Sequence, residues 1–172
     1  MYLILILKKI AKKTIRLFFP NYRTKFSLYK NSKPYENIRK DIVDIIIQDG
    51  VFLEVYWKIL EIGKGPAVTL VVYDYEILRF DCFGKEKGHY HIMLREYENK
   101  SEQRIYFPEK TVEEQIDRTV FEITGNLYYY IHRNPIRKVR NMKISEDRLW
   151  EAARQAKIKM YEYYKNVPEL CD

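Results

Sequence analysis

Residues 77–94 read ILRFDCFGKEKGHYHIML, and this stretch decides which fold the chain can adopt. Apolar and polar residues alternate on both sides of the segment Gly84–Gly88, which is the pattern of two strands joined by a turn. A five-residue turn over this segment pairs Asp81 with His91 and makes the two strands antiparallel. The stretch therefore predicts a β-hairpin with charged and histidine side chains on one face.

The same two-residue period continues outward from the hairpin. Upstream, residues 51–61 alternate as a long strand, and Gly63–Pro66 has the composition of a turn. Downstream, Pro108 ends the last short strand. Loops this short join antiparallel neighbours, so we predict a five-stranded antiparallel meander. The predicted strands are Val51–Glu61, Ala67–Tyr73, Ile77–Phe83, His89–Tyr97 and Arg104–Phe107.

A helical spacing of apolar residues precedes the predicted sheet. A helix that begins at Ser32–Pro34 gathers four isoleucines in one stripe, and Asp49–Gly50 is a stop signal for it. The stripe consists of Ile38, Ile42, Ile45 and Ile46. We therefore expect a helix between the amino-terminal segment and the first strand.

Two further helices are predicted after the sheet. Thr111 and Glu114 form a capping-box signature, which begins a helix that ends at Asn134–Pro135. The last helix covers Glu146–Tyr164. The predicted class is α+β: a five-stranded antiparallel meander with amino-terminal helices and two carboxyl-terminal helices packed on it. Residues 34–172 are expected to form a single domain.

The amino-terminal segment, residues 1–33, is a separate basic arm. It contains nine Lys or Arg residues and no acid. Residues 34–50 carry −2 and residues 51–172 contain twenty of each sign, so the arm is the source of the positive net charge of +7. Residues 3–19 fit an amphipathic helix followed by a polar connector. The cationic side of that helix consists of Lys8, Lys9, Lys12, Lys13 and Arg16.

Three interpretations of the arm stay open. Its apolar face can pack on its own domain or on another subunit of an oligomer. It can lie on a membrane surface with its lysines toward anionic headgroups. It can also bind a nucleic-acid backbone. The apolar run at residues 2–7 is too short to span a bilayer.

Composition limits the other functional classes. The chain has 172 residues and is 47% hydrophobic, which suits one globular domain with a sizeable core. Two cysteines without a CxxC pair provide neither a disulfide framework nor a structural zinc site. A reducing cytoplasm is the expected location, with peripheral contact to the membrane if the arm binds there.

The candidate site is the polar face of the hairpin, formed by Arg79, Asp81, His89 and His91. In an acid–base interpretation, His91 is the general base or acid, Asp81 orients it, and Arg79 holds a phosphate. In a metal interpretation, His89, His91 and Asp81 ligate a divalent metal ion and leave coordination positions open. In a structural interpretation, the same residues are an ion pair and two histidines on a solvated strand.

The residues Leu78-Arg79-Phe80-Asp81, followed by Gly88-His89-Tyr90-His91, resemble the TumE-type family of small bacterial proteins, the toxin partners of toxin–antitoxin pairs. The resemblance covers about residues 51–131 and implies a related sheet with the same polar hairpin. We therefore expect a small bacterial protein that binds or cleaves RNA through this face. The alternative is a non-catalytic protein that attaches to a membrane surface or a larger assembly through its arm.

Overall fold

The computed structural model describes residues 38–73, 75–92 and 103–166. The chain divides into two compact units, Met1–Tyr35 and Glu36–Asp172, and every described element belongs to the second unit. The predicted amphipathic helix over residues 3–19, with its five basic side chains, lies outside the described residues. Within the described part of the chain, no helix is long and apolar enough to cross a membrane.

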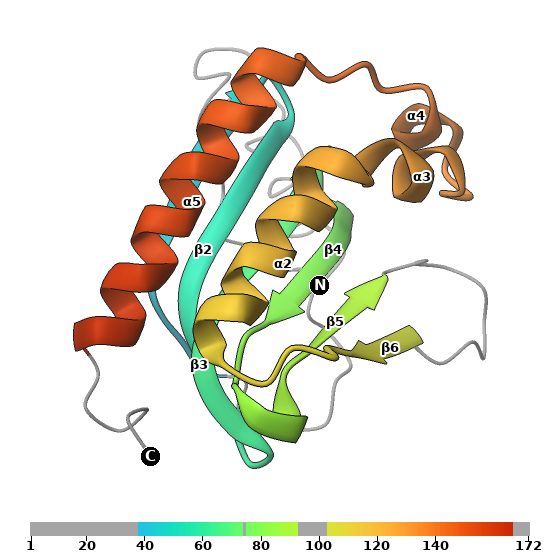
Figure 1. Cartoon of the computed structure of the whole chain (residues 1–172). Helices are drawn as coiled ribbons and strands as arrows, with labels where there is room; N and C mark the ends of the chain where they lie inside the picture. Colours follow the sequence, from blue (N-terminus) through green and yellow to red (C-terminus); the bar gives the residue numbers. More distant parts are fainter. Residues whose placement is uncertain (1–37, 74, 93–102, 167–172) are drawn as a thin grey trace, which may run out of the picture. The chain divides into compact units, whose positions relative to one another are not determined.

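The second unit has an α+β fold built on one antiparallel sheet. The sheet has six strands in the order β1-β2-β3-β4-β5-β6, so each strand pairs with its neighbour in sequence (Figure 1). The meander prediction is confirmed, but the predicted count of five strands is wrong. The strands are β1 Ile38–Gln48, β2 Val51–Leu60, β3 Gly63–Val72, β4 Tyr75–Asp81, β5 His89–Ile92 and β6 Gln103–Tyr106.

The additional strand is β1, which replaces the helix predicted before the sheet. Asp49–Gly50 does not end a helix but joins β1 to β2 in a two-residue turn, with Gln48 opposite Val51. Gly50 adopts a φ of 71° there, which favours glycine. A two-residue β-turn also joins β2 to β3 at Glu61–Ile62, upstream of the predicted turn, so Gly63 already belongs to β3.

Four helices follow the sheet: α2 Val112–Gly125, α3 Leu127–His132, α4 Arg137–Arg140 and α5 Glu146–Asn166. The predicted capping box is confirmed, because the Glu114 amide donates to Thr111 Oγ1 and the Thr111 amide donates to the Glu114 carboxylate. The single helix predicted from Thr111 to Asn134 is instead divided at Asn126 into α2 and α3. The basic segment between the two predicted helices, residues 137–143, contains the short helix α4.

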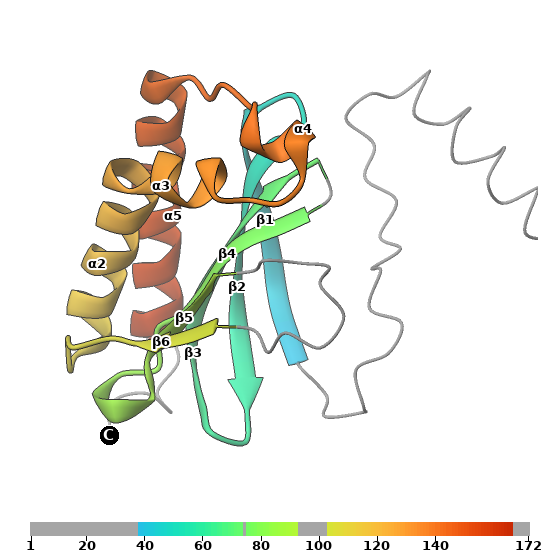
Figure 2. The same cartoon turned by 90° about the vertical axis from the view of Figure 1, so that its right-hand side faces the viewer.

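The helices cover one face of the sheet. Helices α2 and α5 lie on the same side in both views (Figures 1 and 2). The side chains that form the core with them alternate along the central strands, for example Leu53, Val55, Leu70 and Phe80. The intervening residues point to the opposite face, and this face holds the polar hairpin residues. The carboxyl-terminal helices therefore do not pack on the candidate site.

Candidate functional site

Strands β4 and β5 place the four predicted side chains on one face of the sheet. Arg79 is opposite His91 and Asp81 is opposite His89, so all four point the same way. The predicted pairing of Asp81 with His91 is wrong by two residues, because the connection is longer than Gly84–Gly88 and contains a 3-10 turn at Lys85–Lys87. A shift of two residues preserves the face of every side chain, and the shared face therefore survives the change of register.

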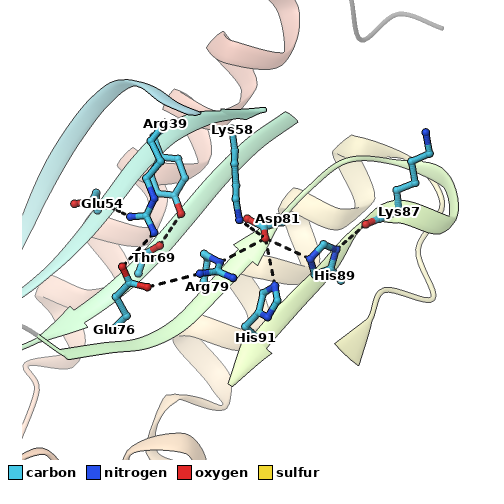
Figure 3. Close-up of polar contacts among 11 residues, drawn as sticks. Arg39, Glu54, Lys58, Thr69, Glu76, Arg79, Asp81, Lys87, His89 and His91 are labelled. Atoms are coloured by element: carbon cyan, nitrogen blue, oxygen red, sulfur yellow. Dashed lines mark hydrogen bonds and ion pairs between the residues drawn. The ribbon is translucent and has the colours of Figure 1, made fainter. Parts of the chain in front are cut away.

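One carboxylate oxygen, Asp81 Oδ2, is the centre of the cluster (Figure 3). It lies 2.7 Å from Lys58 Nζ and 3.5 Å from Arg79 Nε. The Nε2 atoms of His89 and His91 lie 3.4 Å and 3.5 Å from the same oxygen. All five side chains are buried, and Asp81 is 0% exposed. The cluster is thus an interior site and not the solvated strand of the structural interpretation.

Lys58 is the member of the cluster that sequence reasoning missed. It comes from β2, where Glu54, Tyr56 and Lys58 alternate with core residues and point to the polar face. This alternation is visible in the sequence, but it does not show which residue of another strand lies beside Lys58. Strand β3 lies between β2, which carries Lys58, and β4, which carries Asp81. A prediction that these two residues are neighbours therefore needs the register of β2 on β3 and that of β3 on β4. Tyr56 completes the row by sharing a hydrogen bond of 2.9 Å with Thr69.

A chain of ion pairs continues from the cluster toward β1. Arg39 contacts Glu54 at 2.6 Å and Glu76 at 3.1 Å, and Arg79 lies 3.8 Å from Glu76. Together with Lys58 and Asp81, these residues form a network of three cations and three anions on one face of the sheet. The charges of the described network therefore balance when both histidines are neutral.

His89 is oriented by the backbone of the connection that precedes it. Its Nδ1 lies 2.7 Å from the carbonyl oxygen of Lys87. A carbonyl only accepts, so Nδ1 carries the proton and the neutral ring presents the Nε2 lone pair to Asp81. Neither His89 Nε2 nor Asp81 Oδ1 has a hydrogen-bond partner within the described structure. His89 Nε2 faces Asp81 Oδ2, which accepts from Lys58 Nζ at 2.7 Å, but the Nε2 lone pair itself lacks a donor within the described structure. A buried polar atom without a partner is unfavourable.

The connection itself is held by Gln115 of helix α2. The buried Gln115 amide accepts from the Gly84 backbone at 2.9 Å and donates to the Glu109 carbonyl at 2.9 Å. Gly88 has no room for a side chain, because a Cβ there would lie 2.0 Å from Gln115 Oε1. Helix α2, which packs on the face of the sheet opposite the cluster, thus holds in place the loop that orients His89.

Burial shifts the pKa of the groups that surround Asp81 Oδ2. It lowers the pKa of His89 to about 4, so this ring is neutral near pH 7. It also lowers the pKa of Lys58 to about 8, although the Asp81 charge acts in the opposite direction. Burial acts to raise the pKa of Asp81, but the contact with His91 and the charges of Lys58 and Arg79 outweigh it and hold that pKa well below its usual range.

Two of the three ligand–ligand distances among Asp81, His89 and His91 suit a tetrahedral metal ion. Ligands bound at about 2.0–2.2 Å to tetrahedral zinc are about 3.4 Å apart. The two His Nε2 atoms lie 3.4 Å and 3.5 Å from Asp81 Oδ2, longer than usual N–H···O hydrogen bonds but close to this spacing. One ligand atom from each of the three residues lies within 4.8 Å of the others. Two imidazoles and a carboxylate are ligands that zinc and ferrous iron accept.

Cys82 lies outside the site, as its place in the alternation predicts. It is buried on the helix-covered face, 3.5 Å from Thr119 Oγ1, and burial raises the pKa of its thiol to about 12. A thiol with a raised pKa is a poor nucleophile at neutral pH.

Comparisons of the chain with protein-family models, with curated proteins and with solved structures found no significant match.

Proposed function

We propose that the protein binds one divalent transition-metal ion, zinc or ferrous iron, through Asp81, His89 and His91. The observation that carries the proposal is the buried His89 Nε2, an acceptor that lacks a donor within the described structure and lies 3.4 Å from Asp81 Oδ2, with the second His89 nitrogen committed to Lys87. A backbone carbonyl that fixes one imidazole nitrogen while the other ligates is the usual outer-shell arrangement of metal-bound histidine.

Metal content tests this proposal. Purified full-length protein dialysed against limiting zinc is expected to retain one ion per chain by elemental analysis. Asp81→Asn and His91→Ala are expected to lose the ion, because each removes one of three ligands. His132→Ala is the matched control, since this histidine is exposed at the end of α3. Absence of stoichiometric metal, or equal content in all variants, would rule the metal site out.

RNA is a second candidate ligand, favoured by two exposed side chains on β6. Tyr106 is 55% exposed opposite His89, and Arg104 is exposed opposite His91. An aromatic ring beside a cation is a common platform for single-stranded nucleic acid. Because His91 itself is buried, this platform supports binding of RNA at β6 more directly than acid–base cleavage by His91.

Fluorescence anisotropy with a short single-stranded RNA tests the second candidate. Tyr106→Ala and Arg104→Ala are each expected to weaken binding, whereas Tyr129→Ala, an exposed tyrosine on α3, is expected to leave it unchanged. Equal RNA affinity of all variants would rule out β6 as the surface that binds RNA. Cleavage that persists in His91→Ala would remove His91 as the general base.

For the basic arm we propose attachment to an anionic surface. The support is its sequence, with nine cations and no acid in residues 1–33. Such a segment is attracted to anionic lipid headgroups, and each cation near the surface adds about 1 kcal/mol.

A further inference from the structure

The polar face contains a cation that the metal site alone does not accommodate. Lys58 Nζ donates to Asp81 Oδ2 at 2.7 Å, and this same oxygen is the one that both histidines face. Lys58 is 2% exposed, so its ammonium group cannot turn to solvent without a rearrangement of the sheet face. Arg79 Nε lies 3.5 Å from the same oxygen.

A metal ion bound by Asp81 competes with Lys58 for negative charge. Zinc–oxygen bonds are about 2.0–2.2 Å long, so the ion lies within about 5 Å of Lys58 Nζ if it binds Asp81 Oδ2. Two cations then share one carboxylate in an interior site, where like charges repel strongly and the loss of a counter-ion is costly. Lys58 therefore needs a new anionic partner when the metal is bound.

We infer that the site takes its metal together with a small oxyanion, a phosphate or carboxylate group, that ligates the metal and is held by Lys58 and Arg79. This inference rests on the proposed function. Asp81, His89 and His91 supply three ligands and leave a fourth tetrahedral position for one anion oxygen. The remaining oxygens accept from the Lys58 ammonium and the Arg79 guanidinium, both of which form strong hydrogen bonds with phosphate and carboxylate.

Burial defines the size of this anion. Lys58, Asp81, His89 and His91 are each no more than 2% exposed, so a polymer cannot contact them and the partner is a small group. The ligand class is therefore a small molecule with a terminal phosphate or carboxylate, which separates this site from the RNA candidate on β6.

Cobalt binding in different anions tests the inference on the full-length protein. Co²⁺ is titrated at constant ionic strength in chloride, acetate and sulfate, with its visible absorption spectrum as the readout; sulfate stands in for phosphate because its cobalt salt is soluble. We expect sulfate or acetate to tighten apparent Co²⁺ binding by about tenfold and to change the spectrum, since an anion that binds with the metal stabilises the complex by mass action.

Two variants locate the anion. In Lys58→Met the effect of the anion is expected to disappear while Co²⁺ still binds in chloride, and Arg79→Gln provides a second variant if Lys58→Met does not fold. The exposed Lys85→Met, in the loop before His89, is the matched control and should behave like the unmodified protein.

The outcomes separate the inference from the metal proposal. Equal Co²⁺ affinity and equal spectra in all three anions would overturn the inference and leave the metal site intact. An anion effect that persists in both Lys58→Met and Arg79→Gln would also overturn it. Failure of Co²⁺ to bind in any anion would instead overturn the metal proposal itself.

Discussion

Lys58 and Asp81 place opposite charges 2.7 Å apart in the interior of the domain. Removing one partner leaves the other charge buried, which typically costs about 3–5 kcal/mol, whereas replacing both by apolar residues is often nearly neutral. In metal-free protein we expect Lys58→Met to lower the free energy of unfolding by about this amount. The double variant Lys58→Met/Asp81→Leu should recover most of the loss in urea denaturation. A double variant less stable than Lys58→Met would show that the pair is not the source of the cost.

His89 makes the stability of the metal-free protein depend on pH. Its pKa is about 4 in the folded chain, below its ordinary value near 6.5, so the unfolded chain binds the proton more readily. This contribution to stability is present above pH 6.5 and is lost as the pH falls toward 4. We expect the free energy of unfolding to decrease by about 2 kcal/mol across this window in the presence of a chelator.

The control for this pH effect is the exposed histidine of α3. Urea denaturation at several pH values should give a smaller slope for His89→Gln, whereas His132→Gln should keep the slope of the unmodified protein. If His89→Gln keeps the full slope, the buried imidazole does not cause the pH dependence.

At the scale of single residues, the sequence predicts which face of the sheet a side chain lies on, but it predicts less well which residues that side chain contacts. Alternation placed Arg79, Asp81, His89 and His91 on one face although the pairing was wrong, because the error was an even number of residues. Lys58 could not be placed in the same way. Its position beside Asp81 depends on where β2 turns into β3, and that turn falls at Glu61–Ile62 and not at the glycine-rich segment that follows.

Strand β1 shows how one spacing can fit two kinds of element. The residues Ile38, Ile42, Ile45 and Ile46 fit a helical stripe, but the segment is rich in β-branched residues and ends in Asp49–Gly50. β-branched side chains favour strands, and Asp-Gly is a strong hairpin signal. In the strand, Ile45 and Ile47 are buried, whereas Ile42 and Ile46 are exposed.

Two adjacent isoleucines distinguish the strand from the predicted helix. Ile47 is 2% exposed and Ile46 is 66% exposed, whereas the helical stripe would bury Ile46. We expect Ile47→Ala to lower the free energy of unfolding by about 2–5 kcal/mol, because it leaves a cavity in the core. Ile46→Ala should change it by less than about 1 kcal/mol. If urea denaturation shows a larger loss of stability for Ile46→Ala than for Ile47→Ala, the result would favour the predicted helix over the strand.

The division of α2 from α3 was also beyond the sequence pattern, for a different reason. Apolar spacing continues across Asn126, so periodicity alone predicts one helix. The division accompanies a buried carboxylate, Glu122, which accepts from Asn126 Nδ2 at 2.9 Å and from Tyr130 Oη at 2.5 Å. Such tertiary hydrogen bonds have no signature in local spacing.

For the whole molecule, the positive charge and the candidate site belong to different parts of the chain. The positive charge lies in residues 1–33, which carry +9, whereas residues 34–50 carry −2 and residues 51–172 are neutral and contain the buried cluster. Nonspecific attraction to an anionic surface should therefore depend on the arm, and metal content should depend on the sheet face. Composition alone suggested one basic protein, and only the position of each charge separates these two properties.

Vesicle binding of the full-length protein tests this separation. We expect co-sedimentation with anionic vesicles, but not with zwitterionic ones, and we expect salt to weaken it by screening. Replacing the five arm cations by Gln should abolish binding and leave metal content unchanged; these are Lys8, Lys9, Lys12, Lys13 and Arg16. The matched control replaces five exposed cations of the folded domain: Lys85, Lys87, Arg137, Lys138 and Lys143. Binding that falls equally in both variants would contradict a specific role of the arm, because it would then reflect net charge alone.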